Sequence, residues 1–181
     1  MYLKPSRIAL SAILLLTLSC IRGGAAERGW GSRSFGGVFS PKGVGLSASF
    51  QRPGGNFTSM SVNADLSDIL AGNDLVSGVR GAVYFDIPML EKDCNGLPCC
   101  IYAGPGLTAG YLHDKGSVDC GFMAGLSGAA GVRFGMWHHM VLAVEWQMDL
   151  AFILEGKSTV SFYKAGCMYS YYPHLRLQYE F

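Results

Sequence analysis

The sequence YYPHLRLQYEF, at residues 171–181, decides the fold. Apart from Pro173, every second side chain in it is apolar or aromatic: Tyr171, Leu175, Leu177, Tyr179 and Phe181. The alternate positions are mostly polar: Tyr172, His174, Arg176, Gln178 and Glu180. A period of two is typical of a β-strand, because successive side chains of a strand point to opposite faces. We therefore expect a strand with one apolar face and one polar face.

The same alternation recurs upstream of this segment. Eight stretches of the chain show it: 33–40, 43–52, 55–66, 77–87, 99–112, 121–135, 139–152 and 171–181. An even number of strands lets an antiparallel barrel close with both chain ends on one side. The sequence therefore predicts an all-β protein, a closed, antiparallel, up-and-down β-barrel of eight strands.

The polar faces indicate whether this barrel lies in water or in a membrane. They hold three arginines among acidic residues: Asp65, Arg80, Asp86, Arg133, Glu145, Asp149, Arg176 and Glu180. The interior of an eight-stranded barrel is just wide enough for side chains, so these groups could pair there. A soluble sandwich or a lipocalin-like barrel would instead turn its apolar faces inward. We expect polar faces inside and apolar faces outside, as in a transmembrane β-barrel.

Aromatic residues of the apolar faces fall into two rows if strand directions alternate. One row belongs to the end that holds the chain termini: Phe35, Phe50, Phe85, Phe134, Tyr179 and Phe181. The other belongs to the opposite end: Phe39, Tyr111, Phe122, Phe152 and Tyr171. Two aromatic girdles around one apolar band are favoured where lipid meets water.

Glycines are also expected on the polar face, where they would leave room for long arginine side chains. They lie in two stretches: Gly104, Gly106, Gly110, Gly125 and Gly131. The abundance of glycine in the chain, at 25 residues, is an equally simple explanation.

The first residues have the layout of a secretory signal peptide. Lys4 and Arg7 precede an apolar run at 8–18, and small residues at 23–26 offer a cleavage site. We expect residues 1–26 to be the signal and 27–181 the barrel domain. The alternative is a lipidated Cys20, although Leu18 stands where lipoprotein signals commonly have a small residue.

Composition limits the remaining functions. The chain is 50% hydrophobic, with mean hydropathy +0.26, yet after residue 26 it has no apolar run of the roughly 18 residues that a membrane helix needs. Loss of residues 1–26 lowers Lys plus Arg from 14 to 11 against 13 Asp plus Glu, a net charge of −2. That charge argues against a nucleic-acid partner.

Three features together resemble the small outer-membrane β-barrel family of Gram-negative bacteria. They are the alternating strand that ends in Phe181, the tract at 102–106 (YAGPG) and the tract at 131–134 (GVRF). The resemblance implies a bacterial outer-membrane location, contact with outer-membrane lipid, and a C-terminal strand read by the barrel-assembly machinery. It implies no reaction.

Five cysteines lie beyond the expected signal: Cys94, Cys99, Cys100, Cys120 and Cys167. Export permits disulfides, and two are conceivable, one from Cys120 to Cys167 between surface loops and one from Cys94 to Cys99 or Cys100 within the connection 88–98. The spacing does not fix the pairing. A metal site of Cys94, Cys99 and Cys100 with His138 and His139 is the alternative, though its spacing matches no standard zinc pattern.

No residue is singled out as catalytic, cofactor-binding or metal-binding. We expect a non-catalytic envelope component without a pore, whose loops 67–76, 112–120 and 153–170 contact an extracellular partner. One alternative is a lipid-modifying enzyme with His174 as base, oriented by Asp149 or Glu145 and paired with a loop serine. Ser127, in a stretch that only partly matches a nucleophile elbow, is expected to be a mid-strand interior residue. The other alternative is a soluble periplasmic carrier of an apolar ligand.

Overall fold

The computed structural model describes residues 33–52, 55–66, 78–94, 96–113, 120–136, 139–155, 160–163, 167 and 172–181. Its regular structure is all β. The strands are β1 (Arg33–Ser40), β2 (Gly43–Gln51), β3 (Phe57–Asp65), β4 (Val79–Cys94), β5 (Leu97–His113), β6 (Cys120–Gly135), β7 (Met140–Glu155), β8 (Val160–Phe162) and β9 (His174–Glu180). None of the described segments is a helix with the length and apolarity of a membrane span.

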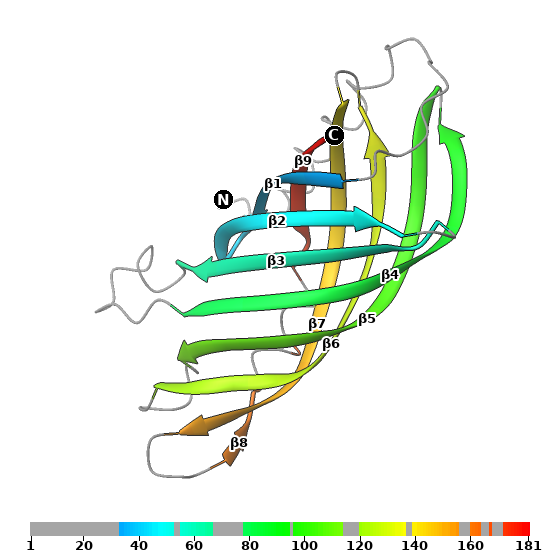
Figure 1. Cartoon of the computed structure of the whole chain (residues 1–181). Helices are drawn as coiled ribbons and strands as arrows, with labels where there is room; N and C mark the ends of the chain where they lie inside the picture. The colour runs from blue at the N-terminus through cyan, green and yellow to red at the C-terminus, as the bar shows by residue number, and fades with distance from the viewer. Residues whose placement is uncertain are drawn as a thin grey trace, which may run out of the picture.

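Eight of the strands form a ring that closes on itself. Each of β1 to β7 pairs antiparallel with the next, and β9 pairs with both β7 and β1 (Figure 1). The short β8 pairs with β7 alone, from Phe152 to Leu154. The predictions of an all-β fold and of eight antiparallel strands in chain order around a ring are confirmed.

The two ends of the ring differ. At one, here called the terminal end, the amide of Phe181 donates a hydrogen bond to the carbonyl of Arg33 at 2.8 Å. At the other end, here called the loop end, residues 41–42 connect β1 to β2, and the strands β3, β5 and β7 end. The expected loops 67–76 and most of 112–120 lie outside the described residues.

The two faces of the ring have opposite chemistry, and they are the faces predicted from the alternation. The predicted polar-face residues Arg80, Asp86, Glu145, Asp149 and Arg176 are at most 2% exposed and lie inside. Large apolar side chains point outward from every ring strand, and many are about half exposed, such as Leu107 at 59%. The ring therefore has a polar interior and an apolar exterior, the reverse of a soluble protein.

Both predicted rows of aromatic side chains are on the outward face. At the terminal end Phe35 lies opposite Tyr179 in the β1–β9 register, and both are exposed. At the loop end Tyr111 lies opposite Phe122 in the β5–β6 register, and both are again exposed. Tyr171 lies outside the described residues.

The expected connection at 88–98 is wrong, because both strands continue through it. β4 runs on to Cys94 and β5 begins at Leu97, so only two residues separate the strands, and Gly96 has a φ of 82°. A register shift between Pro88 and Leu90 marks a β-bulge. In Figure 1 this hairpin extends well past the end of β3.

The predicted strands stop too early on both sides of this hairpin, because Pro88 and Pro98 are typical of strand ends. β3 pairs with β4 only as far as Asp86, so Pro88 lies on an edge where no hydrogen-bond donor is needed. Pro98 likewise precedes the first β5–β6 pair, at Cys99. The expected loop 153–170 is also shorter than predicted, because β7 continues to Glu155 and β8 follows.

Candidate functional site

The interior of the ring is filled by a connected set of polar side chains, here called the interior network. Its members are Arg80, Tyr84, Tyr102, Ser127, Glu145, Gln147, Asp149 and Arg176. They come from β4, β5, β6, β7 and β9, so the network crosses the ring from wall to wall.

Arg80 forms the centre of the half nearer the loop end. Its Nε lies 2.5 Å from Asp149 Oδ2, and its NH2 donates to Asp149 Oδ1 at 2.6 Å and to the Tyr84 hydroxyl at 2.9 Å. The Ser127 hydroxyl also donates to Asp149 Oδ1, at 2.5 Å. This bidentate geometry is the strong form of an arginine–carboxylate pair.

Arg176 forms the second centre. Its NH2 lies 2.5 Å from Glu145 Oε2 and 2.6 Å from the Tyr102 hydroxyl, which itself donates to Glu145 at 2.7 Å. Gln147 joins the two centres, because its amide nitrogen donates to Glu145 at 2.6 Å and its amide oxygen accepts from Arg80 at 2.8 Å. The predicted pairing of arginines with acids across the interior is therefore present.

Asp86 is a buried interior carboxylate outside the three arginine pairs of the described residues. Arg133 pairs with Glu180 near the terminal end, so the three interior arginines are matched with three acids. Asp86 is 0% exposed and accepts a hydrogen bond from Ser59 on Oδ2, while its Oδ1 has no hydrogen-bond partner among the described residues. Among the described residues, Asp86 is therefore a fully buried carboxylate that forms no ion pair with an arginine.

Near the loop end, the part of the interior beside β6, β7 and β8 is apolar. Met123, Ala151, Ile153 and Tyr163 form a buried cluster there, all at most 2% exposed. The amide of Tyr163, just after β8, donates to the carbonyl of Ala151 at 2.8 Å. Side chains thus occupy the described interior from the terminal end to this cluster.

The predicted glycines lie on the interior face, but at two of them a tyrosine ring occupies the adjacent space. A Cβ on Gly131 would lie 2.8 Å from the Tyr102 hydroxyl and 2.6 Å from the carbonyl of Val144. A Cβ on Gly106 would lie 2.6 Å from the ring of Tyr84. Gly106 and Gly131 therefore make room for Tyr84 and Tyr102, which hydrogen-bond to the arginines. The sequence alone suggests instead that the glycines make room for the arginines themselves.

We expect Gly131→Ala to lower the free energy of unfolding by about 1–3 kcal/mol, because the new methyl group meets backbone on one side and Tyr102 on the other. The matched control is Gly128→Ala on the same strand, where the nearest atom to a Cβ is 3.9 Å away. The control should be neutral or stabilising by up to about 1 kcal/mol. Denaturant titration of both variants measures the difference, and equal stabilities would contradict this packing.

Of the enzyme alternative, His174, Glu145 and Asp149 lie in the interior, while most serines of the expected loops lie outside the described residues. His174 is 2% exposed and lies opposite Glu145 in the β7–β9 register. The Ser127 hydroxyl contacts Asp149, Tyr84 and the carbonyl of Met148. Ser127 is 7% exposed in the middle of β6, which confirms it as a mid-strand interior residue.

The cysteines of the β4–β5 hairpin are free thiols, so the expected disulfide there is not formed. The bulge places Cys100 opposite Glu91 on the buried face, whereas Cys99 lies opposite Lys92 on the other face. Cys94 and Cys99 are close enough for their thiols to hydrogen-bond. The side chain of Cys120 lies outside the described residues.

No group of three potential metal ligands is assembled within the described part of the chain. The proposed metal set of cysteines and histidines also included His138, which is not among the described residues.

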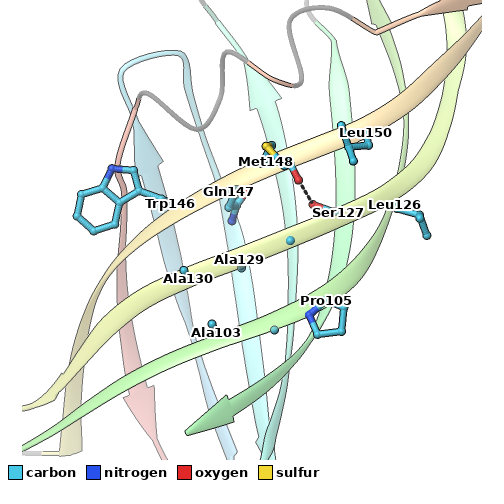
Figure 2. Close-up of a pocket in the computed structure, with 12 residues that line it drawn as sticks. Ala103, Pro105, Leu126, Ser127, Ala129, Ala130, Trp146, Gln147, Met148 and Leu150 are labelled. Carbon is cyan, nitrogen blue, oxygen red and sulfur yellow. Dashed lines mark hydrogen bonds between the residues drawn. The ribbon is translucent and has the colours of Figure 1, made fainter. Parts of the chain in front are cut away.

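A hollow of about 610 Å³ lies on the outward face across β5, β6 and β7. Figure 2 shows Trp146, Met148 and Leu150 along its β7 side, with Pro105 on β5 and Leu126 on β6. Its outward floor is made of small residues, namely Ala103, Gly128 and Ala130. Nothing in the alternation pattern pointed to this hollow, because alanine and glycine satisfy an apolar position as well as leucine does.

No family model matches the chain, and neither a curated protein nor a solved structure is detectably similar to it.

Proposed function

We propose that this protein is an integral outer-membrane β-barrel, a non-catalytic component of the bacterial envelope. The proposal rests on the distribution of side chains in the ring, which is the reverse of that in a soluble protein. Charged and polar side chains are buried inside, while large apolar side chains such as Leu46, Leu107 and Leu126 are about 60% exposed outside. No described outward position between the two aromatic rows carries a charged side chain.

The size of this apolar surface supports a lipid environment. A soluble monomer rarely exposes an apolar patch of more than a few hundred Å², but here outward apolar side chains come from all eight ring strands. In water this surface would carry the full cost of apolar hydration. In a bilayer the same surface faces acyl chains, and the polar groups stay out of contact with lipid.

The spacing of the aromatic rows also supports a bilayer. On β6 the outward rings of Phe122 and Phe134 mark the two rows. At about 3.4 Å per residue the backbone between them spans about 41 Å. A strand tilt of about 35–45° reduces this to a height of about 29–33 Å, close to the roughly 30 Å hydrocarbon thickness of a bilayer.

The filled interior argues for a structural or surface role and against conduction. Eight strands leave room only for side chains. Here the interior network connects those side chains across the ring, and an apolar cluster fills part of the loop end. Interactions with an extracellular partner would then fall to the surface loops. Outer-membrane lipid surrounds the barrel, and the barrel-assembly machinery would insert it.

The carrier alternative requires an apolar cavity inside the ring. The interior instead holds Arg80, Arg133 and Arg176, each at most 6% exposed, and most large apolar side chains point away from it. This facing favours the membrane barrel over a soluble carrier.

The proposal is tested by folding the purified chain, unfolded in urea, into phospholipid vesicles. We expect β-type circular dichroism to develop with the vesicles and the protein to float with them in a density gradient after an alkaline carbonate wash. Folding to a monomer that stays at the bottom of the gradient, with or without vesicles, would refute the proposal. A chain diluted into buffer without vesicles is the control.

A further inference from the structure

We propose that the hollow on the outward face is a binding groove for one acyl chain of a membrane lipid; this inference rests on the proposed membrane location. Many outward positions of the ring carry large, exposed apolar side chains, among them Leu46, Leu107 and Val62. At the hollow this cover is interrupted by Ala103, Gly128 and Ala130.

The groove lies at the middle of the apolar band. On β6 the outward residues run from Phe122 in one aromatic row to Phe134 in the other, and Gly128 is equally far along the strand from both. At this depth only hydrocarbon is available from the lipid, because headgroups lie at the level of the aromatic rows. The lining has no ionisable side chain, which suits a chain and not a headgroup.

The walls of the groove favour an acyl chain over a protein helix. At the level of Gly128, Pro105 on β5 and Met148 on β7 flank the floor on β6. Neighbouring strands are about 4.8 Å apart, so the flanking backbones are about 10 Å apart before their side chains narrow the gap. A helix with its side chains is about 10–12 Å across, which is too wide to reach the floor. A single acyl chain is thinner and can lie along it.

Pro105 is an unusual wall residue that adds to this argument. It lies in the middle of β5, where proline has no backbone N–H to donate to a neighbouring strand. The β4–β5 pairs accordingly stop at Tyr84 with Gly106 and resume at Ile87 with Ala103. Regular β4–β5 pairing is therefore interrupted at Pro105. The short, rigid proline ring leaves open the space above the floor that a leucine side chain would cover.

An acyl chain seated on this floor would regain the dispersion contacts that the small residues leave unmade. Surfaces at a void lose contact partners outright, and hydrocarbon of the right width restores them. Trp146, which is 44% exposed on the β7 side of the hollow, would add contacts to the bound acyl chain.

Native mass spectrometry of protein extracted from phospholipid vesicles into mild detergent tests the groove. The wild-type chain is expected to retain one phospholipid. Gly128→Leu, which fills the floor, should lower the lipid-bound fraction about tenfold, equivalent to about 1.4 kcal/mol. The control Ala124→Leu places the same side chain at an exposed outward position of β6 that does not line the groove, and it should retain the lipid.

Vesicle flotation of each variant separates the outcomes. Space beside Gly128 makes its substitution compatible with folding, and Ala130→Leu fills the same floor as a second variant. Lipid retention that is equal in all variants, or absent from a wild-type chain that floats with vesicles, overturns the groove but leaves the membrane proposal standing. A wild-type chain that does not float with vesicles overturns both.

Discussion

Glu145→Gln is expected to lower the free energy of unfolding by about 3–5 kcal/mol, because removal of one member of a buried ion pair leaves the other charge uncompensated. Glu145 is 0% exposed and accepts hydrogen bonds from Arg176, Tyr102 and Gln147. The glutamine keeps the shape but not the charge, so Arg176 would remain buried without its carboxylate. Denaturant titration in detergent micelles, followed by tryptophan fluorescence, measures the loss.

Asp86→Asn provides the matched control, since it also neutralises an interior carboxylate that is 0% exposed. Asp86 forms no ion pair with a described arginine, and an asparagine oxygen can still accept the hydrogen bond from Ser59. Burial of an unpaired charge is costly, so we expect this variant to be as stable as the wild type or more stable. Equal destabilisation by Asp86→Asn and Glu145→Gln would contradict the charge pairing described above.

Leu107→Arg is the second large effect, expected to destabilise the protein in a bilayer by about 2–4 kcal/mol. Leu107 points outward in the middle of the apolar band, where a cation facing lipid is most costly. Tyr111→Arg lies on the same strand and face at the aromatic row, where the cost falls to about 0–1 kcal/mol. The two positions are similarly exposed, at 59% and 55%.

This pair separates a lipid environment from an aqueous one. If water surrounded the ring, arginine would be tolerated equally at both positions, because each side chain is already more than half exposed. Refolding yield and unfolding free energy in vesicles are the readouts. Indistinguishable Leu107→Arg and Tyr111→Arg variants would count against lipid at the outward face.

The alternation of apolar and polar residues predicted the strands and their faces because period two is a local property. It also placed arginines and acids in one interior, since an eight-stranded ring leaves nowhere else for them. It could not assign Arg80 to Asp149 or Arg176 to Glu145, because the partners' proximity depends on how the closed ring brings strands together. Tyr102 was not recognised as part of the interior network for the same reason.

The β4–β5 hairpin escaped prediction for a local reason. The bulge after Pro88 moves Leu90 onto the outward face, which breaks the period that identified the strand. The dipeptide Asn95-Gly96 between the two strands is a strong hairpin signal that could have shown the short turn. The hollow at Gly128 could not be predicted, since it depends on side chains from three strands.

The central claim is that lipid covers the outward face of the ring, and its most direct test is fractionation of cells that export the protein. We predict that the chain stays in the outer membrane after a carbonate wash. Its mobility on a detergent gel should also differ between unboiled and boiled samples, as expected of a closed barrel that resists detergent until heated. Recovery of the chain in the soluble fraction, with one mobility before and after boiling, would contradict the account.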